Sequence, residues 1–286
     1  MKANEINIRD PFILLDEGKY YMYGSRGNEL WGECTGLDVY ISDDLVEWSE
    51  PQVAFEKHDG FWADRNFWAP EVHKYNGKYY MLATFKSPSR MRGTQILVSD
   101  SPTGPFMPHS DGPITPEEWS CLDGTLYVEN GIPYMIFCHE WTQVVDGEMC
   151  LVQLTEDMKA PVGEPRILFR ASELPCGSNK RYNGYITDGP FLYRSSNGKL
   201  IMIWSSFDAN GYIEAVAVSD NGSINGNWIL CEMPLSAENG GHGMLFKDKD
   251  GNLNFTMHSP NTPRCAERVR IFSIREIDEA PYLEFN

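Results

Sequence analysis

The sequence has no long apolar run and no clear amphipathic helical pattern. No stretch of 18 apolar residues occurs in the 286 residues, so a membrane-spanning helix is not expected. The opening residues MKANEINIRD contain no apolar segment typical of a secretory signal, which favours a cytoplasmic location. These absences argue against a membrane partner, and the length suits one large domain, which we expect to span residues 1–286.

Basic residues are scarce compared with acidic ones. The chain has 24 lysines and arginines against 41 aspartates and glutamates, which gives a net charge of −17. Such a charge repels the phosphate backbone of nucleic acids and the head groups of anionic lipids. We therefore expect a neutral ligand, and neither nucleic acid nor a membrane surface as partner.

Paired cysteines and the common catalytic motifs are absent as well. The seven cysteines form no C-x-x-C pair, and their odd number argues against a disulfide framework or a zinc site. They suit a reducing compartment. Since the sequence has no glycine-rich phosphate loop, G-x-S-x-G or H-E-x-x-H motif, it does not support a nucleotide-binding protein, a serine hydrolase or a zinc protease.

The sequence does contain a hairpin repeat that runs through its whole length. The first copy is RDPFILLDEGKYYMYGS, and the later copies are WAPEVHKYNGKYYMLATF, LDGTLYVENGIPYMIFCHE, TDGPFLYRSSNGKLIMIWSSF and GHGMLFKDKDGNLNFTMHSP. Asn-Gly and Asp-Gly pairs at the turns are strong hairpin signals. At least one more apolar strand follows most hairpins, so each unit has three or four strands. Five such units predict an all-β, five-bladed β-propeller, whereas the alternative β-sandwich would need neither five units nor a shared motif.

The same place in each repeat carries residues suited to catalysis. Aligned on the residue before the proline or glycine, the five copies present Asp10, Ala69, Asp123, Asp188 and His242. An aspartate before proline or glycine is a common turn former, so one case alone would mean little. Equivalent positions of a propeller face the same axis, however. Carboxylates placed close together there repel one another, which raises the pKa of at least one of them. This pattern is typical of a catalyst that needs one proton donor and one base.

Other residues are expected around the same funnel because they end the second strand of a hairpin or lie close to the repeat position. Aromatic faces combined with polar groups suit sugar rings. The expected substrate-binding residues are Trp68, Phe85, Glu140, Trp141, Phe207, His242 and Arg264. His242 is also a candidate ligand for a structural calcium ion on the axis, although the sequence has no dense cluster of metal ligands.

In this order, the stretches RDPFIL, WAPEVHKYNGKYYM, LDGTLYVENGIPYMIF, TDGPFL and GHG resemble glycoside hydrolase family 43. The resemblance runs from Asp10 to about Asn261. It implies a five-bladed propeller that hydrolyses arabinose- or xylose-containing glycans with inversion and without a cofactor, as an α-L-arabinofuranosidase or β-xylosidase does. It also implies that Asp10 is the general base and that Asp123 orients and tunes the general acid.

The position of the general acid departs from the family pattern. The family has glutamate before Gly-Pro, whereas this chain has Asp188, whose carboxyl falls short by about 1.3 Å. Three explanations are open: a shifted backbone lets Asp188 act as the acid, Glu140 replaces it, or the protein is a weak or inactive sugar-binding propeller. The sequence decides neither the sugar and its linkage nor whether the action is exo or endo.

Overall fold

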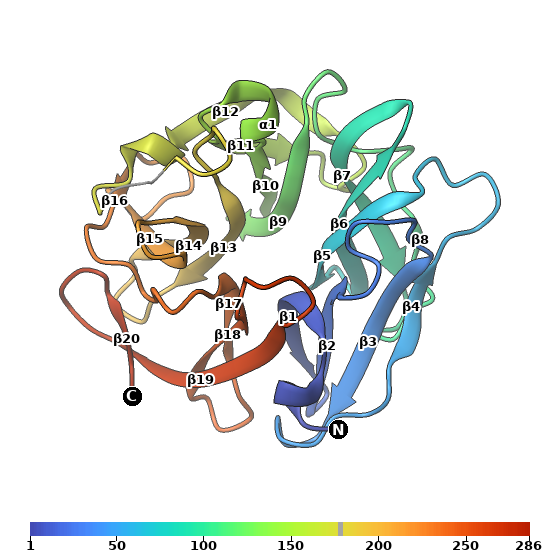
Figure 1. The fold of residues 1–286 in the computed structure, drawn as a ribbon, viewed down its shortest axis with the longest axis horizontal. Helices are drawn as coiled ribbons and strands as arrows, with labels where there is room; N and C mark the ends of the chain where they lie inside the picture. Colours follow the sequence, from blue (N-terminus) through green and yellow to red (C-terminus); the bar gives the residue numbers. More distant parts are fainter. Residues whose placement is uncertain (177–179) are drawn as a thin grey trace.

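The computed structural model describes residues 1–176 and 180–286 as five four-stranded sheets around a central axis (Figure 1). Neighbouring strands within each sheet are antiparallel. The predicted five-bladed β-propeller is therefore confirmed, and the β-sandwich alternative is wrong.

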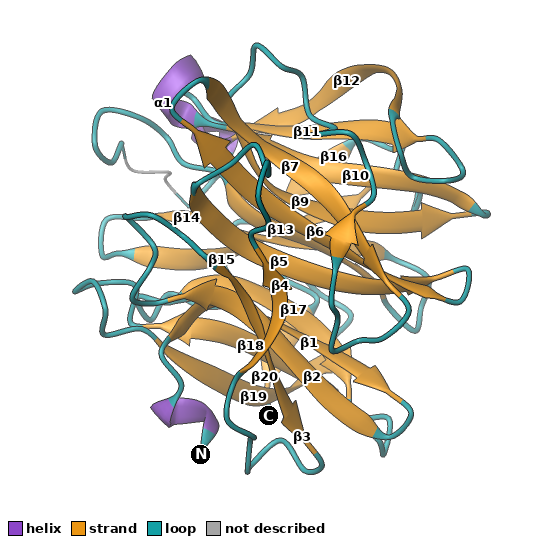
Figure 2. Ribbon diagram, turned by 90° about the vertical axis from the view of Figure 1, so that its right-hand side faces the viewer, coloured by secondary structure: helices purple, strands orange, loops and turns teal. Residues whose placement is uncertain are grey.

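Figure 2 shows that strands make up most of the chain. The short helical segments of the described residues are η1 (Ala3–Glu5), α1 (Trp141–Val144) and η2 (Ala171–Glu173). No helix in this described part is long and apolar enough to cross a membrane.

Each blade is built from four strands that follow one another in the chain. Blade 1 contains β1 (Ile8–Asp16), β2 (Lys19–Arg26), β3 (Gly36–Ser42) and β4 (Gln52–Glu56). Blade 2 contains β5 (Arg65–Tyr75), β6 (Lys78–Ser87), β7 (Arg90–Ser99) and β8 (Met107–Pro108). Blade 3 contains β9 (Cys121–Glu129), β10 (Ile132–His139), β11 (Glu148–Leu154) and β12 (Pro161–Arg170). Blade 4 contains β13 (Asp188–Arg194), β14 (Leu200–Phe207), β15 (Tyr212–Ser219) and β16 (Trp228–Leu230). Blade 5 contains β17 (Gly241–Lys247), β18 (Leu253–Ser259), β19 (Arg268–Glu276) and β20 (Leu283–Phe285).

The hairpin turns and the buried second strands explain why the sequence folds into blades. Asn76-Gly77 and Asn130-Gly131 both have positive φ at both residues, as a two-residue hairpin turn with the twist of the strands requires. Strand β14 is buried along its entire length, because neighbouring blades cover both of its faces. The apolar core therefore lies in layers between the blades. On the axis, Phe12 and Phe191 from different blades meet edge to face at 6.1 Å.

The first strand of each blade, here called the inner strand, is interrupted at the same point by a shift in its pairing register. One residue at this point, here called the shifted residue, has positive φ. The five residues are Asp10 (56°), Ala69 (45°), Asp123 (56°), Gly189 (48°) and His242 (51°). The expected alignment is therefore wrong by one residue in blade 4, where Gly189 and not Asp188 is the equivalent of Asp10. The physical reason is that Pro190, rather than Gly189, matches Pro11 after the shift.

A ring of hydrogen bonds joins these five shifted positions. In four blades, a side chain on the second strand accepts the backbone N–H of the shifted residue in the next blade. The pairs are Ala69 to Ser25 Oγ (2.8 Å), Asp123 to Thr84 Oγ1 (2.9 Å), His242 to Ser205 Oγ (2.6 Å) and Asp10 to His258 Nδ1 (3.3 Å). In blade 3 the corresponding residue is Cys138, and the Gly189 N–H donates instead to Asp123 Oδ2 at 3.1 Å. This exception joins the backbone beside Asp188 to the Asp123 carboxyl.

Candidate active site

A cleft of about 470 Å³ at the propeller axis brings together nearly all of the expected site residues. Its lining includes Asp10, Trp68, Asp123, Glu140, Trp141, Asp188, Phe207, His242 and Arg264. Phe85 is the exception, and its predicted role in substrate binding is wrong. Its side chain is fully buried, with its ring centroid 4.9 Å from that of Phe67 and 5.8 Å from that of Phe55. The side chain points into the core between blades because strand residues alternate between faces.

Asp10 is held as a carboxylate by donors on several sides. The Ser25 hydroxyl donates to Asp10 Oδ2 at 2.5 Å, and His242 Nδ1 lies 3.1 Å from Oδ1. Burial alone would raise the pKa of the Asp10 carboxyl, but the charges of His242 and Arg9 lower it by more. As a result, the pKa of Asp10 lies below its ordinary value. Asp10 is therefore ionised over most of the pH range and can accept a proton.

Arg9 and His258 complete the surroundings of Asp10. Arg9 Nε lies 3.8 Å from Asp10 Oδ1, while its guanidinium also donates to Glu267 (3.1 Å) and Asn261 (2.8 Å). Burial, together with the charge of Arg9, holds the pKa of His258 well below its ordinary value. His258 is therefore neutral, in agreement with its Nδ1 accepting the Asp10 N–H.

Asp123 and Asp188 have the opposite tendency from Asp10. Burial raises the pKa of Asp123 to about 7, with a further increase from Asp188, although His242 lowers it. Burial also raises the pKa of Asp188 to about 6, against the lowering effects of His242 and the Tyr212 hydroxyl. Asp188 keeps part of its surface open to the cleft. The site therefore holds one carboxyl whose pKa is lowered and two whose pKa values are raised toward neutral pH.

Glu140 is fixed in a different way. It forms an ion pair with Arg92, and its Oε2 also accepts hydrogen bonds from Ser120 Oγ (2.8 Å) and Thr142 Oγ1 (2.7 Å). All three contacts are made to Oε2, so the protein itself already occupies this oxygen. Arg92 also lies 4.6 Å from the ring of Trp68, so the Glu140 pair supports an aromatic side chain of the cleft.

Aromatic side chains border the cleft on two sides. From blades 1 and 2, Trp31 and Trp68 meet edge to face at 5.4 Å, and Arg264 lies 4.4 Å from the Trp31 ring. From α1 and from the loop before blade 4, Trp141 and Tyr182 stack at 6.2 Å. Trp31 and Tyr182 are exposed by 57% and 65%, so both offer apolar surface to a ligand. These two groups can contact sugar units on either side of the carboxylates.

The residues around His242 do not fit a calcium ion held by protein side chains. His242 Nδ1 faces Asp10 (3.1 Å) and Asp123 (3.8 Å), and its ring packs against Gly189. Burial lowers the pKa of His242, but these carboxylates raise it above its ordinary value, so the ring tends to carry a proton. Residues 1–176 and 180–286 contain no group of three histidine, cysteine or acidic side chains placed to hold a metal. The positions of the Asp10 and Asp123 carboxyls give His242 an electrostatic role beside them.

Several residues of the cleft were not expected from the sequence. They are Arg9, Trp31, Arg92, Tyr182 and Tyr212. Arg9 belongs to the RDP motif, so its neighbour Asp10 was a signal for it. Tyr212 begins the third strand of blade 4 and reaches the carboxylates only because the chain folds back there. Trp31 and Tyr182 lie outside the strands, where the hairpin repeat gives no guide to position.

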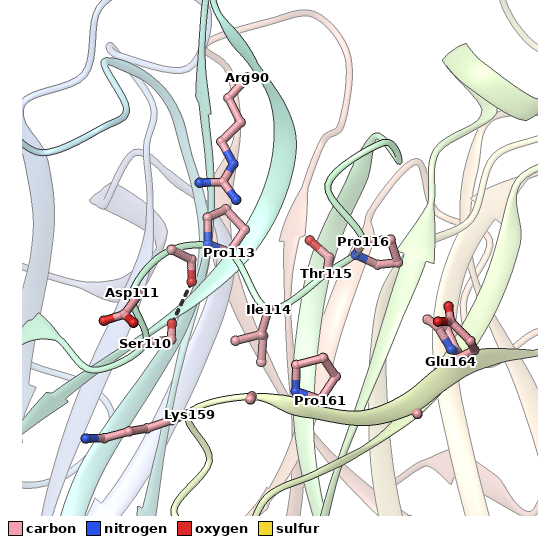
Figure 3. A pocket seen from close by; sticks show the side chains of 14 residues that line it. Arg90, Ser110, Asp111, Pro113, Ile114, Thr115, Pro116, Lys159, Pro161 and Glu164 are labelled. Carbon is pink, nitrogen blue, oxygen red and sulfur yellow. Dashed lines mark hydrogen bonds between the residues drawn. The ribbon is translucent and has the colours of Figure 1, made fainter.

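A second cavity of about 500 Å³ lies between the segments around Arg90, Pro113 and Pro161 (Figure 3). Prolines and Ile114 form much of its wall, and Arg90, Lys159, Asp111 and Glu164 contribute charges of both signs. Its lining residues in the described chain include no aromatic side chain and none of the three aspartates of the main cleft. It is therefore less suited to a sugar ring than the cleft on the axis.

Comparison with known proteins identifies relatives of this fold and site. The crystal structure of an endo-arabinase from Bacteroides thetaiotaomicron is 41% identical, with a TM-score of 0.90, and the match covers 97% of this chain and 98% of that one. A protein of Bacteroides ovatus described as a xylosidase/arabinosidase is 30% identical over 138 residues, which are 43% of this chain and 42% of that protein. A probable arabinan endo-1,5-alpha-L-arabinosidase A of Emericella nidulans is 24% identical, over 85% of this chain and 74% of that protein.

The match thus spans less than half the length of the Bacteroides ovatus relative but almost all of the solved structure. The family model of the glycosyl hydrolases family 43 matches residues 5–276, which include all five blades and the three aspartates. This family hydrolyses O-glycosyl bonds. From the match over nearly its whole length, and from its propeller fold, we conclude that the chain belongs to glycosyl hydrolases family 43.

Proposed function

We propose that this protein is an inverting glycosidase that hydrolyses internal α-L-arabinosidic bonds of arabinan. The observation that carries the proposal is the separation of the carboxyl pKa values in one cleft. The pKa of Asp10 is lowered, since His242 and Arg9 outweigh the effect of burial, whereas burial raises the pKa of Asp188 to about 6. One ionised and one protonated carboxyl are the two groups that glycoside hydrolysis needs.

The proposed reaction is a single displacement. Asp10 accepts a proton from a water molecule, and this water attacks the anomeric carbon of the sugar. Asp188 donates its proton to the glycosidic oxygen as the bond to the leaving sugar breaks. Since water enters on the face opposite the leaving group, the product has the inverted anomeric configuration.

Asp188 is preferred to Glu140 as the acid because their surroundings differ. Glu140 is paired with Arg92, and its Oε2 accepts two hydroxyl donors, so this oxygen is already occupied by the protein. Burial instead raises the pKa of Asp188 to about 6, and part of its surface is open to the cleft. Asp123 accepts the Gly189 N–H, so we assign it the role of orienting the backbone beside the acid.

Two observations support arabinan and internal cleavage. The similar solved structure is that of an endo-arabinase, and the Emericella relative is named for endo action on arabinan. Aromatic groups also border the cleft on two sides, as an enzyme that binds sugar units on both sides of the scissile bond requires. Exo-acting arabinofuranosidase or β-xylosidase activity is the competing reading, supported by the name of the Bacteroides ovatus relative.

The proposal is tested with purified protein on linear 1,5-linked arabinan, with xylan and nitrophenyl β-xyloside in parallel. Release of mixed arabino-oligosaccharides from the start of the reaction is expected, and proton NMR of fresh products is expected to show the inverted anomer first. Early release of arabinose alone would contradict internal cleavage, and faster turnover of the xylose substrates would contradict the sugar. Binding of arabinan without hydrolysis would favour a sugar-binding propeller.

A further inference from the structure

We propose that Tyr212 is a positioning residue for the general acid, whose hydroxyl fixes one oxygen of Asp188 so that the other carries the catalytic proton. This inference rests on the function proposed above, in which Asp188 is the acid. It concerns the feature in which this chain departs from its family, an aspartate where glutamate is expected.

The ring of Tyr212 is held tightly on three sides. It contacts Phe207 at a centroid distance of 4.9 Å and stacks on His258 at 5.8 Å. A Cβ at Gly241 would lie 2.8 Å from the ring, so this glycine is needed for the ring to approach the backbone. Only 1% of Tyr212 is exposed, and its hydroxyl therefore has one fixed position.

The hydroxyl donates to Asp188 Oδ2 at 3.0 Å. Burial holds the pKa of Tyr212 well above its ordinary value, so the phenol remains a donor wherever the enzyme is assayed. In a protonated carboxyl, the carbonyl oxygen is the better acceptor, so the proton is favoured on Oδ1. Within the described residues, no hydrogen bond to Oδ1 is found, which leaves this oxygen for the leaving group.

The contact also compensates for the shorter side chain. Asp188 has one rotatable bond fewer than glutamate, and Tyr212 restrains the carboxyl further, so less freedom is lost when the substrate binds. The charged and titratable groups that face Asp188 come from four other elements: Arg9 on β1, Asp123 on β9, Glu140 after β10 and His242 on β17. Tyr212 on β15 is a direct neutral donor to the carboxyl.

The variant Tyr212→Phe tests the inference because it removes the donor and keeps the ring. Without this donor the acid holds its proton more tightly, so the alkaline limb of kcat/KM is expected to move to higher pH. A loss of orientation is expected to lower kcat on arabinan by about tenfold to a hundredfold. Cleavage of a nitrophenyl arabino-oligosaccharide should fall much less, because a good leaving group departs with little protonation.

A double-mutant comparison separates positioning from a merely structural role. In the Asp188→Asn background, Tyr212→Phe is expected to have no further effect, since no acid is left to orient. Tyr193→Phe is the control, because it removes a partly buried phenol that donates to Glu276 and does not line the cleft, and it should leave the pH profile unchanged. Melting temperatures of all variants identify any that are misfolded.

An unchanged pH profile and leaving-group dependence in folded Tyr212→Phe, or an equal loss in both backgrounds, would overturn the inference. The proposed function itself fails in a different way. In that case the wild-type protein does not cleave arabinan, or Asp188→Asn lacks the selective loss on poor leaving groups.

Discussion

The Asp10 carboxyl is the group from which the proposed reaction starts. In Asp10→Asn the amide cannot accept the proton of the attacking water, so a loss of turnover of about a hundredfold to ten-thousandfold is expected. The fold should remain, because the amide oxygen can still accept the Ser25 hydroxyl. Initial rates on arabinan and the melting temperature provide the measurement. A variant with more than about a tenth of the wild-type rate would remove Asp10 from the role of base.

The choice between Asp188 and Glu140 as the acid is tested by two matched variants. Asp188→Asn is expected to slow cleavage of arabinan far more than that of a nitrophenyl arabino-oligosaccharide, because an activated leaving group needs little protonation. Glu140→Gln weakens the pairing with Arg92 and should lower the rates on both substrates to a similar degree. If the selective loss appeared in Glu140→Gln instead, Glu140 would be the donor. If neither variant lost activity, the sugar-binding alternative would be favoured.

The pH profile of the wild-type enzyme follows from the same two groups. Asp10 must be ionised, and its pKa is lowered because His242 and Arg9 outweigh burial, so the acidic limb should lie below the ordinary range of aspartate. Asp188 must be protonated, and burial raises its pKa to about 6, so kcat/KM should fall as the pH rises through this value. Burial raises the pKa of the neighbouring Asp123 to about 7, with a further increase from Asp188, so this limb reflects both carboxyls. Constant activity up to pH 8 would contradict the assignment.

The residues of the site were predictable only where the repeat determined their position. Asp10 and Asp123 follow from their place before proline or glycine in an inner strand. The prediction for Phe85 was wrong because it depended on which face of the strand end is directed toward the axis. A shift of one residue moves a side chain from that face to the opposite one. Tyr212 was missed because its proximity to Asp188 arises from the path of β14 and β15, which gives no local signal.

The register shift in the first strand of each blade determines where the carboxyls lie. Its presence could be predicted from the RDP, LDG and GHG motifs, but its register in blade 4 could not. Both TDG and DGP match the repeat, and only the pairing of Asp188 with Ser205 and of Phe191 with Ile203 decides between them. Gly189 therefore has the shifted conformation, and its N–H reaches Asp123.

The variant Gly189→Ala tests this element. Alanine can adopt the positive φ of this position, because Ala69 has the same backbone conformation in blade 2. A Cβ on residue 189, however, would lie 2.6 Å from ring atoms of His242. The ring must then move away from Asp10, and a fall in kcat/KM of about tenfold to a hundredfold is expected. Ala69→Gly is the control at the equivalent position and should retain activity. Wild-type activity of Gly189→Ala would show that the contact between residue 189 and His242 is unimportant.

At the scale of the whole molecule, the propeller closes without sharing a strand between its ends. Blade 1 is built entirely from residues 8–56, and blade 5 from residues 241–285. The first and last blades are held together by side chains instead. Arg9 donates to Glu267 and Asn261, Asn7 donates to the Glu267 carbonyl, and the Asp10 N–H donates to His258. The closure of the ring and the surroundings of the proposed base therefore depend on the same contacts.

Glu267→Gln tests whether this contact closes the ring. The Glu267 side chain is fully buried and accepts Arg9 Nη1 at 3.1 Å, and a charged hydrogen bond of this kind contributes roughly 2 kcal/mol. The variant is expected to lower the melting temperature by several degrees while the unfolding remains cooperative. The control is Arg275→Gln, which removes an exposed ion pair with Glu284 inside blade 5 and should change stability by less than about 1 kcal/mol. Equal melting temperatures for the two variants would mean that the propeller is closed by apolar packing between blades 1 and 5 rather than by Arg9 and Glu267.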